Sequence, residues 1–126
     1  MTEKAARILY IEDDHASRRL VERVLTSRGY EVLVATEGLE GINLAREQNP
    51  QLILMDINLP NMDGREITTR LRSLPNFSEV PIVALTANIS AGGRELALAA
   101  GCGGFMTNPI DVATFPADVE RFLQGK

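Results

Sequence analysis

Acidic side chains stand at two points of the chain where a short apolar run ends. Glu12 and Asp13 follow the run of residues 8–11, and Asp56 follows the run of residues 52–55. Carboxylates that lie a few ångströms apart repel by roughly 4 kcal/mol per pair at an effective dielectric near 20. Such a cluster is stable only when it is protonated or holds a cation, and oxygen ligands favour a hard ion such as Mg²⁺.

A bound divalent ion would let one carboxylate attack a phosphoryl donor, because the ion neutralises charge on the group being transferred. Asp56 is the best candidate nucleophile, since it stands alone whereas Glu12 and Asp13 form a pair. Thr86 ends a further apolar run, and its hydroxyl can donate a hydrogen bond to a phosphoryl oxygen. The simpler alternatives are a solvated turn for the acidic pair and an ordinary strand end for Thr86.

The elements that position these groups alternate between strands and helices. Continuous apolar runs bounded by turn residues are typical of strands buried on both faces of a parallel sheet, and apolar residues at helical spacing predict helices between them. The predicted strands cover residues 7–11, 30–35, 52–56, 81–85 and 104–107. The predicted helices cover roughly residues 16–28, the segment between Thr36 and Asn49, and residues 65–73, 93–100 and 111–123.

Several residues predict where these helices begin and end. Asp14 and Thr36 are candidate N-caps of the first two helices. Gly29 is placed to end the first helix in the left-handed conformation, and Asn49 followed by Pro50 closes the second. The arginines of the first helix are expected to form a solvated face, although Arg18 or Arg19 could approach the acidic edge.

Five strands that alternate with five helices predict an α/β fold with a parallel sheet and right-handed crossovers. In such a sheet the carboxyl ends of the strands lie along one edge, where open α/β sheets bind ligands. The polar groups at the strand ends are therefore expected to converge. With 126 residues, the chain suits a single domain spanning residues 1–126.

Composition excludes several classes of function. A net charge of −4 and an isoelectric point near 5.0 argue against direct binding to nucleic acid or to an anionic membrane. Cys102 is the only cysteine, so the chain has no internal disulfide and no metal site built on cysteines. No apolar run is long enough to span a bilayer, which leaves a cytoplasmic protein as the expectation.

Four motifs together resemble the receiver domain of bacterial response regulators, over about residues 7–123. They are Glu12-Asp13, Asp56 with the turn of residues 58–64, Thr86-Ala87, and residues 105–110. The resemblance implies a flavodoxin-like fold: a five-stranded parallel sheet of order 2-1-3-4-5 with five helices on both faces.

The resemblance also implies roles for individual residues. Asp56 would accept a phosphoryl group from a histidine kinase or a histidine phosphotransfer protein. Asp13 and Asp56 would bind Mg²⁺ through their side chains, Glu12 mainly through water, and Asn58 through its backbone carbonyl. A receiver of this kind catalyses at most its own phosphorylation and dephosphorylation.

Switching residues follow from the same resemblance. Thr86 would bond a phosphoryl oxygen, and Phe105 would swing inward when Thr86 moves. The face formed by the fourth helix, the fifth strand and the fifth helix would contact a downstream protein, whose identity the sequence does not give.

One position departs from the family pattern. Receiver domains usually carry a lysine where this chain has Asn108, and its only lysines, Lys4 and Lys126, lie at the termini. An asparagine amide can donate a hydrogen bond, but it is short and uncharged. This leaves open an alternative, a phosphorylation-independent docking module. A metal-dependent phosphatase is disfavoured, since that class would need a second acid at position 58.

Overall fold

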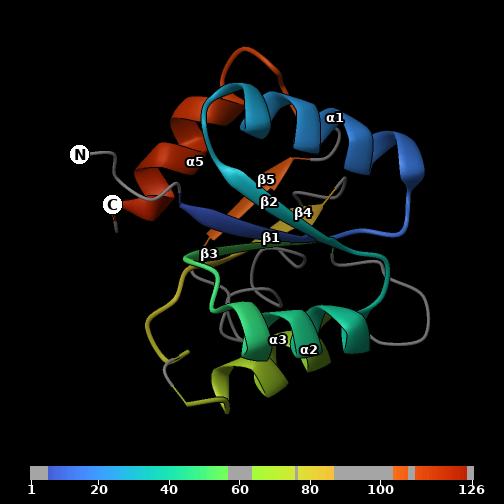
Figure 1. The fold of residues 1–126 in the computed structure, drawn as a ribbon, viewed down its shortest axis with the longest axis vertical. Helices are drawn as coiled ribbons and strands as arrows, with labels where there is room; N and C mark the ends of the chain where they lie inside the picture. The colour runs from blue at the N-terminus through green and yellow to red at the C-terminus, as the bar shows by residue number, and fades with distance from the viewer. Residues whose placement is uncertain (1–5, 57–63, 76, 87–103, 108–109, 125–126) are drawn as a thin grey trace.

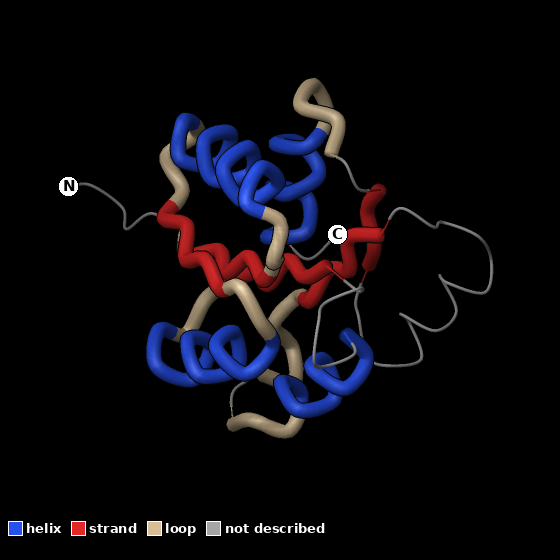
Figure 2. Tube along the Cα trace, turned by 90° about the vertical axis from the view of Figure 1, so that its right-hand side faces the viewer, coloured by secondary structure: helices blue, strands red, loops and turns tan. Residues whose placement is uncertain are grey.

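The computed structural model describes residues 6–56, 64–75, 77–86, 104–107 and 110–124. Within these residues a five-stranded parallel sheet lies between two layers of helices (Figures 1 and 2). The order β2-β1-β3-β4-β5 is the expected flavodoxin-like order. The strands are β1 (Arg7–Ile11), β2 (Glu31–Ala35), β3 (Leu52–Asp56), β4 (Ile82–Thr86) and β5 (Gly104–Thr107).

Four helices are described, and they cover both faces of the sheet. Helices α1 and α5 lie on one face, and α2 and α3 lie on the other (Figure 1). Their bounds are His15–Ser27 for α1, Gly38–Gln48 for α2, Gly64–Arg72 for α3 and Phe115–Leu123 for α5. The helix predicted near residues 93–100 lies outside the described residues.

The central strands are buried on both faces, as their continuous apolar runs predict. Alternate residues of β1 and β3 belong to two separate hydrophobic cores. On the side of α2 and α3 the core includes Leu9 and Met55. On the side of α1 and α5 it includes Tyr10 and Leu54. The ends of β1 and β3 are therefore held by packing from above and below.

Most of the predicted helix boundaries are confirmed. The Asp14 side chain accepts a hydrogen bond from the Ser17 N–H at 2.8 Å and caps α1. Gly29 has a φ of 89° and Asn49 a φ of 49°, the left-handed conformation that ends each of the first two helices.

Two helix starts differ from the prediction. The N-cap of α2 is Glu37 and not Thr36, because the backbone N–H and the hydroxyl of Thr36 both donate to Glu40 Oε1, at 2.7 and 3.1 Å. Helix α5 begins at Phe115 and not at Asp111, because Pro116 fits only in the first turn of a helix.

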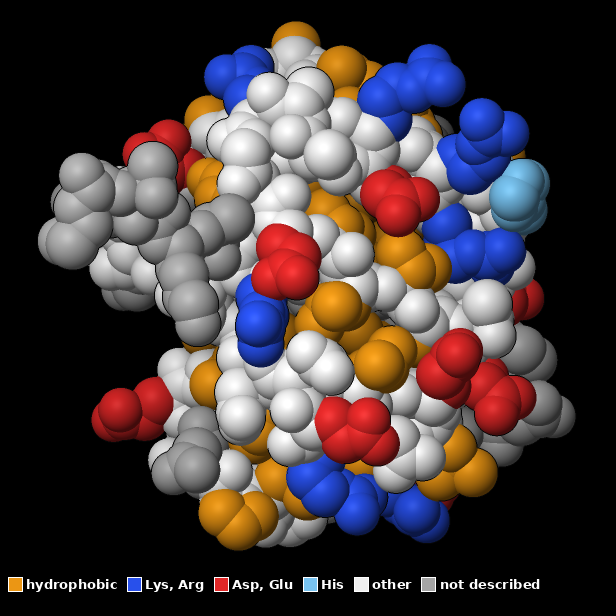
Figure 3. Space-filling model, viewed as in Figure 1, with side chains coloured by type: hydrophobic (Ala, Val, Ile, Leu, Met, Phe, Trp, Pro, Cys, Tyr) orange, Lys and Arg blue, Asp and Glu red, His pale blue; other side chains and the backbone are white. Residues whose placement is uncertain are grey.

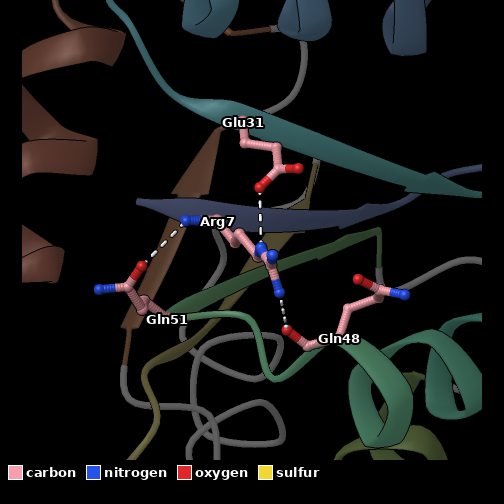
Figure 4. Close-up of polar contacts among 4 residues, drawn as sticks. All are labelled: Arg7, Glu31, Gln48 and Gln51. Carbon is pink, nitrogen blue, oxygen red and sulfur yellow. Dashed lines mark hydrogen bonds and ion pairs between the residues drawn. The ribbon is translucent and has the colours of Figure 1, made fainter. Parts of the chain in front are cut away.

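Arg7 ties several segments together at the edge of the sheet opposite the acidic residues (Figure 4). Its guanidinium donates to Glu31 Oε2 on β2 at 2.8 Å and to the Gln48 carbonyl at the end of α2 at 2.9 Å. Its backbone N–H donates to Gln51 Oε1, just before β3, at 3.0 Å. A single residue thus fixes the starting ends of three neighbouring strands.

We expect Arg7→Met to lower the free energy of unfolding by about 1–2 kcal/mol, because it removes a hydrogen bond to a helix-terminal carbonyl together with an ion pair. Urea unfolding monitored by circular dichroism measures the change. Glu31→Gln is the control, and it should cost less than about 1 kcal/mol because exposed ion pairs contribute little. An equal loss in both variants would show that the ion pair alone matters.

Candidate functional site

Three carboxylates meet at the carboxyl edge of the sheet. In the ladder of β1 and β3, Ile11 lies opposite Met55, which brings the next residues, Glu12 and Asp56, to neighbouring positions. Asp13 completes the group: each of the three side chains offers an oxygen, and these oxygens all lie within 4.8 Å of one another. The convergence predicted for these three acids is therefore present in the structure.

Glu12 is the buried member of this acidic cluster, defined as Glu12, Asp13 and Asp56. Only 1% of Glu12 is exposed, whereas Asp56 is half-buried and Asp13 is exposed. Burial, followed by the hydrogen bond and the charge of Asp56, raises the pKa of Glu12 to about 7. The cluster therefore holds a proton in weakly acidic solution, which relieves the repulsion between Glu12 and Asp56.

Tyr10 lies beside Glu12 and was not predicted as a site residue. Its hydroxyl donates to Glu12 Oε1 at 3.1 Å, and its side chain is fully buried. Burial and the adjacent Glu12 carboxylate raise the pKa of the Tyr10 phenol, so it remains a hydrogen-bond donor. The sequence carries a signal for this contact, because residues two apart on a strand share a face and Tyr10 has the only polar tip in its run.

Arg18 brings a positive charge to the cluster from α1. Its Nη1 donates to the backbone carbonyls of Glu12 and Asp13 at 3.1 and 2.8 Å. These bonds fix the main chain that carries two of the three acids. Of the two arginines that could approach the acidic edge, Arg18 is the one that contacts it, so this part of the helix is not a purely solvated face.

Asp14, the third acid in sequence, is not a member of the cluster. Both the backbone N–H and the hydroxyl of Ser17 donate to Asp14 Oδ2 at 2.8 Å. These hydrogen bonds lower the pKa of Asp14 below its usual value. Asp14 therefore stabilises the start of α1.

The remaining predicted site residues are placed only in part. Thr86 ends β4, where its backbone lies opposite Thr107, one residue beyond the pairing of Asp56 with Leu85. Phe105 lies in β5, opposite Ala84. Asn58 and Asn108 lie outside the described residues.

The surface near the start of α1 is rich in positive side chains. Figure 3 shows blue side chains gathered around the histidine over α1, whose arginines are Arg18, Arg19 and Arg23. The chain as a whole carries a net charge of −4, so this positively charged surface over α1 differs in sign from the protein as a whole. Among the described residues, no helix is both long and apolar enough to cross a bilayer.

Comparison with known proteins places this fold and site in a family. The model of the response regulator receiver domain matches residues 8–120. The polar-differentiation response regulator DivK of Brucella ovis is 34% identical over 116 residues, which covers 92% of this chain and 94% of that protein.

Solved structures agree with this match. The chemotaxis response regulator CheY4 of Vibrio cholerae has a TM-score of 0.89 at 28% identity, covering 93% of this chain and 98% of that one. The receiver domain of the sensor histidine kinase PA1611 from Pseudomonas aeruginosa has a TM-score of 0.88 at 34% identity, covering 95% and 98%, and holds a magnesium ion in its active site cleft. This chain belongs to the receiver domains of two-component response regulators.

Proposed function

We propose that this chain is a phosphoacceptor of a two-component phosphorelay, with Asp56 as the residue that is phosphorylated. The observation that carries the proposal is the acidic cluster, in which Asp56 lies beside Glu12 and Asp13 with ligand oxygens within 4.8 Å of one another. The donor would be a phosphohistidine on a histidine kinase or on a histidine phosphotransfer protein, the partners with which receiver domains work in two-component systems.

The reaction is a transfer between two nucleophiles. A carboxylate oxygen of Asp56 forms a bond to phosphorus while the bond between phosphorus and the histidine nitrogen breaks, and the bonding electron pair returns to the imidazole. Receiver domains are in general signalling modules and not enzymes acting on separate substrates. We assign to this chain only its own phosphorylation and dephosphorylation.

Mg²⁺ suits the acidic cluster on chemical grounds. The donors are carboxylate oxygens, which hard divalent ions prefer, and close carboxylates are relieved of their repulsion by a cation. Asp13 and Asp56 would hold the ion directly, Glu12 mainly through water, and Asn58 through its carbonyl. A bound ion would supply charge neutralisation for the transferring phosphoryl group. The magnesium ion in the related receiver of PA1611 supports this choice.

The phosphorylation signal would pass through Thr86, the last residue of β4, and through Phe105 in the neighbouring strand β5. Thr86 would bond a phosphoryl oxygen, and Phe105 would change its side-chain position in response. The resulting change would reach a downstream protein through a face that includes β5 and α5.

A docking module that needs no phosphorylation is the second candidate. Asn108 favours it, because the position where receivers usually carry a lysine has no charge in this chain. A charge-assisted hydrogen bond would contribute roughly 1.5–3 kcal/mol to holding the phosphoryl group. The two candidates differ in whether Asp56 is modified at all.

Incubation with acetyl phosphate and Mg²⁺ should add one acid-labile phosphoryl group per chain, located at Asp56 by mass spectrometry after reductive trapping. Asp56→Ala should lose the label, because no other acid of the cluster lies in the same place at the end of β3. Asp14→Asn is the matched control and should keep the label, since Asp14 caps α1. Label that persists in Asp56→Ala would contradict the assignment, and an unlabelled wild-type chain would favour the docking module.

Mg²⁺ affinity should depend on pH, because the pKa of Glu12 is raised to about 7 and the ion must displace a proton below that value. One displaced proton lowers the affinity by about tenfold for each pH unit below 7 and leaves it level above about pH 8. Isothermal titration calorimetry at several pH values measures this slope.

Three variants locate this effect. Glu12→Gln should remove the pH dependence, because it removes the titrating group. Asp13→Asn should weaken Mg²⁺ binding strongly, whereas Asp14→Asn should leave it nearly unchanged. Equal losses in the Asp13 and Asp14 variants would move the ion away from the proposed cluster.

Asn108→Lys should weaken Mg²⁺ binding several-fold, because a fixed positive charge competes with the ion for the carboxylates. The same variant should respond more fully to beryllofluoride, since the lysine adds a cation that holds a phosphoryl-like oxygen. Chemical-shift changes across β5 and α5 measure the response. A wild-type response as large as that of the variant would mean that Asn108 or Arg18 already supplies the missing interaction.

A further inference from the structure

Tyr10 is a buried polar residue to which the proposed phosphotransfer assigns no role. It is the fourth of the five residues of β1 and belongs to the core between the sheet and helices α1 and α5, whose other buried members are apolar. Its hydroxyl points along the strand toward the carboxyl edge and donates to Glu12 Oε1 at 3.1 Å. Burying a hydroxyl costs free energy unless it is hydrogen-bonded. The contact with Glu12 is therefore the feature that distinguishes Tyr10 from a phenylalanine.

Both oxygens of the Glu12 carboxylate are held by donors. Oε1 accepts from Tyr10, and Oε2 accepts from the backbone N–H of Asp14 at 3.3 Å. The Glu12 backbone is held as well, because its N–H donates to the Ala35 carbonyl at 2.9 Å and its carbonyl accepts from Arg18. The Asp56 side chain also hydrogen-bonds to the Glu12 carboxylate, so Tyr10 is the partner that holds it from the side of the core.

This arrangement restricts how the buried carboxylate can turn. A glutamate can rotate about three side-chain torsions. The hydrogen bond from the Tyr10 hydroxyl to Oε1 limits these rotations from the side of the core. The Tyr10 hydroxyl therefore acts together with Asp56 in holding the Glu12 carboxylate where the three ligand oxygens lie within 4.8 Å of one another. Ligands held in place before binding lose less entropy when the ion arrives.

We propose that Tyr10 is a positioning residue of the metal site, whose hydroxyl holds the Glu12 carboxylate in the orientation that binds Mg²⁺. This inference rests on the proposed function, since it takes the acidic cluster to be the Mg²⁺ site. Groups that hydrogen-bond to metal ligands and fix their orientation typically change metal affinity by about 10–100-fold when removed. Because Glu12 acts mainly through water, we expect the lower end of that range.

The test is a double-mutant cycle on Mg²⁺ affinity, measured by isothermal titration calorimetry. Tyr10→Phe keeps the ring in the core and removes only the hydroxyl, and it should weaken Mg²⁺ binding by about tenfold. In a Glu12→Gln background the same change should have little further effect, because the carboxylate that the hydroxyl orients is gone. Tyr30→Phe is the matched control. It removes the hydroxyl of the other tyrosine, which is outside the cluster, and should leave the affinity unchanged.

A second measurement does not depend on the Tyr10 variant. The chain has two tyrosines and no tryptophan, so Tyr10 is the only source of tyrosine emission in Tyr30→Phe. Its fluorescence should change during a Mg²⁺ titration with the same midpoint as the calorimetric curve, because the hydroxyl is bonded to a group that faces the ion. An emission that stays constant while the ion binds would overturn the proposal.

The remaining outcomes separate this inference from the proposed function. Mg²⁺ binding that is equal in the wild type and Tyr10→Phe would overturn the role of Tyr10 and leave the metal site standing. Tyr10→Phe could also weaken Mg²⁺ binding by the same factor in the wild-type chain and in the Glu12→Gln variant. That result would also overturn the role of Tyr10, because the loss of affinity would then come from altered core packing and not from the Glu12 carboxylate. A wild-type chain that binds no Mg²⁺ would overturn the metal site and the role of Tyr10 together.

Discussion

Repulsion between carboxylates is the constraint on which this structure depends. Glu12, Asp13 and Asp56 are brought together by the sheet, and a cluster of that charge is unfavourable unless something compensates it. Compensation for this repulsion is visible around Glu12. Its raised pKa lets it keep a proton toward neutral pH. Its carboxylate accepts hydrogen bonds from the Tyr10 hydroxyl and the Asp14 N–H, and its backbone carbonyl accepts one from the Arg18 guanidinium.

The strands and not the loops fix the relative positions of two of these acids. Glu12 and Asp56 lie directly at the ends of β1 and β3, whose registers are set by hydrogen bonding and by cores on both faces. Groups that extend from a packed strand end keep their spacing better than groups on a free loop. A site that must keep like charges close to one another gains most from such a rigid base.

Much of the fold follows from patterns that are simple in physical terms. Apolar runs gave the central strands, and turn residues such as Gly29 and Asn49 marked the helix ends. Thr36 was misplaced because a threonine near a helix start can cap the helix or bond to a side chain one turn on, and the sequence does not distinguish these. Tyr10 was not predicted as a site residue, because a tyrosine within an apolar run predicts core packing, although its hydroxyl shares a face with Glu12. The convergence of Glu12, Asp13 and Asp56 was predictable, because parallel strands place their carboxyl ends at one edge.

The Arg7 contacts give the two edges of the sheet opposite characters. At the edge where the strands begin, the Arg7 guanidinium donates to β2 and to the end of α2. The Arg7 backbone N–H donates to Gln51, just before β3. The carboxyl edge instead gathers acidic groups, among them Glu12, whose charge changes with protonation. The sheet is therefore held by hydrogen bonds at the edge where its strands begin and carries its titrating acids at the edge where they end. A change of charge at the carboxyl edge therefore acts on strands whose starting ends Arg7 holds together.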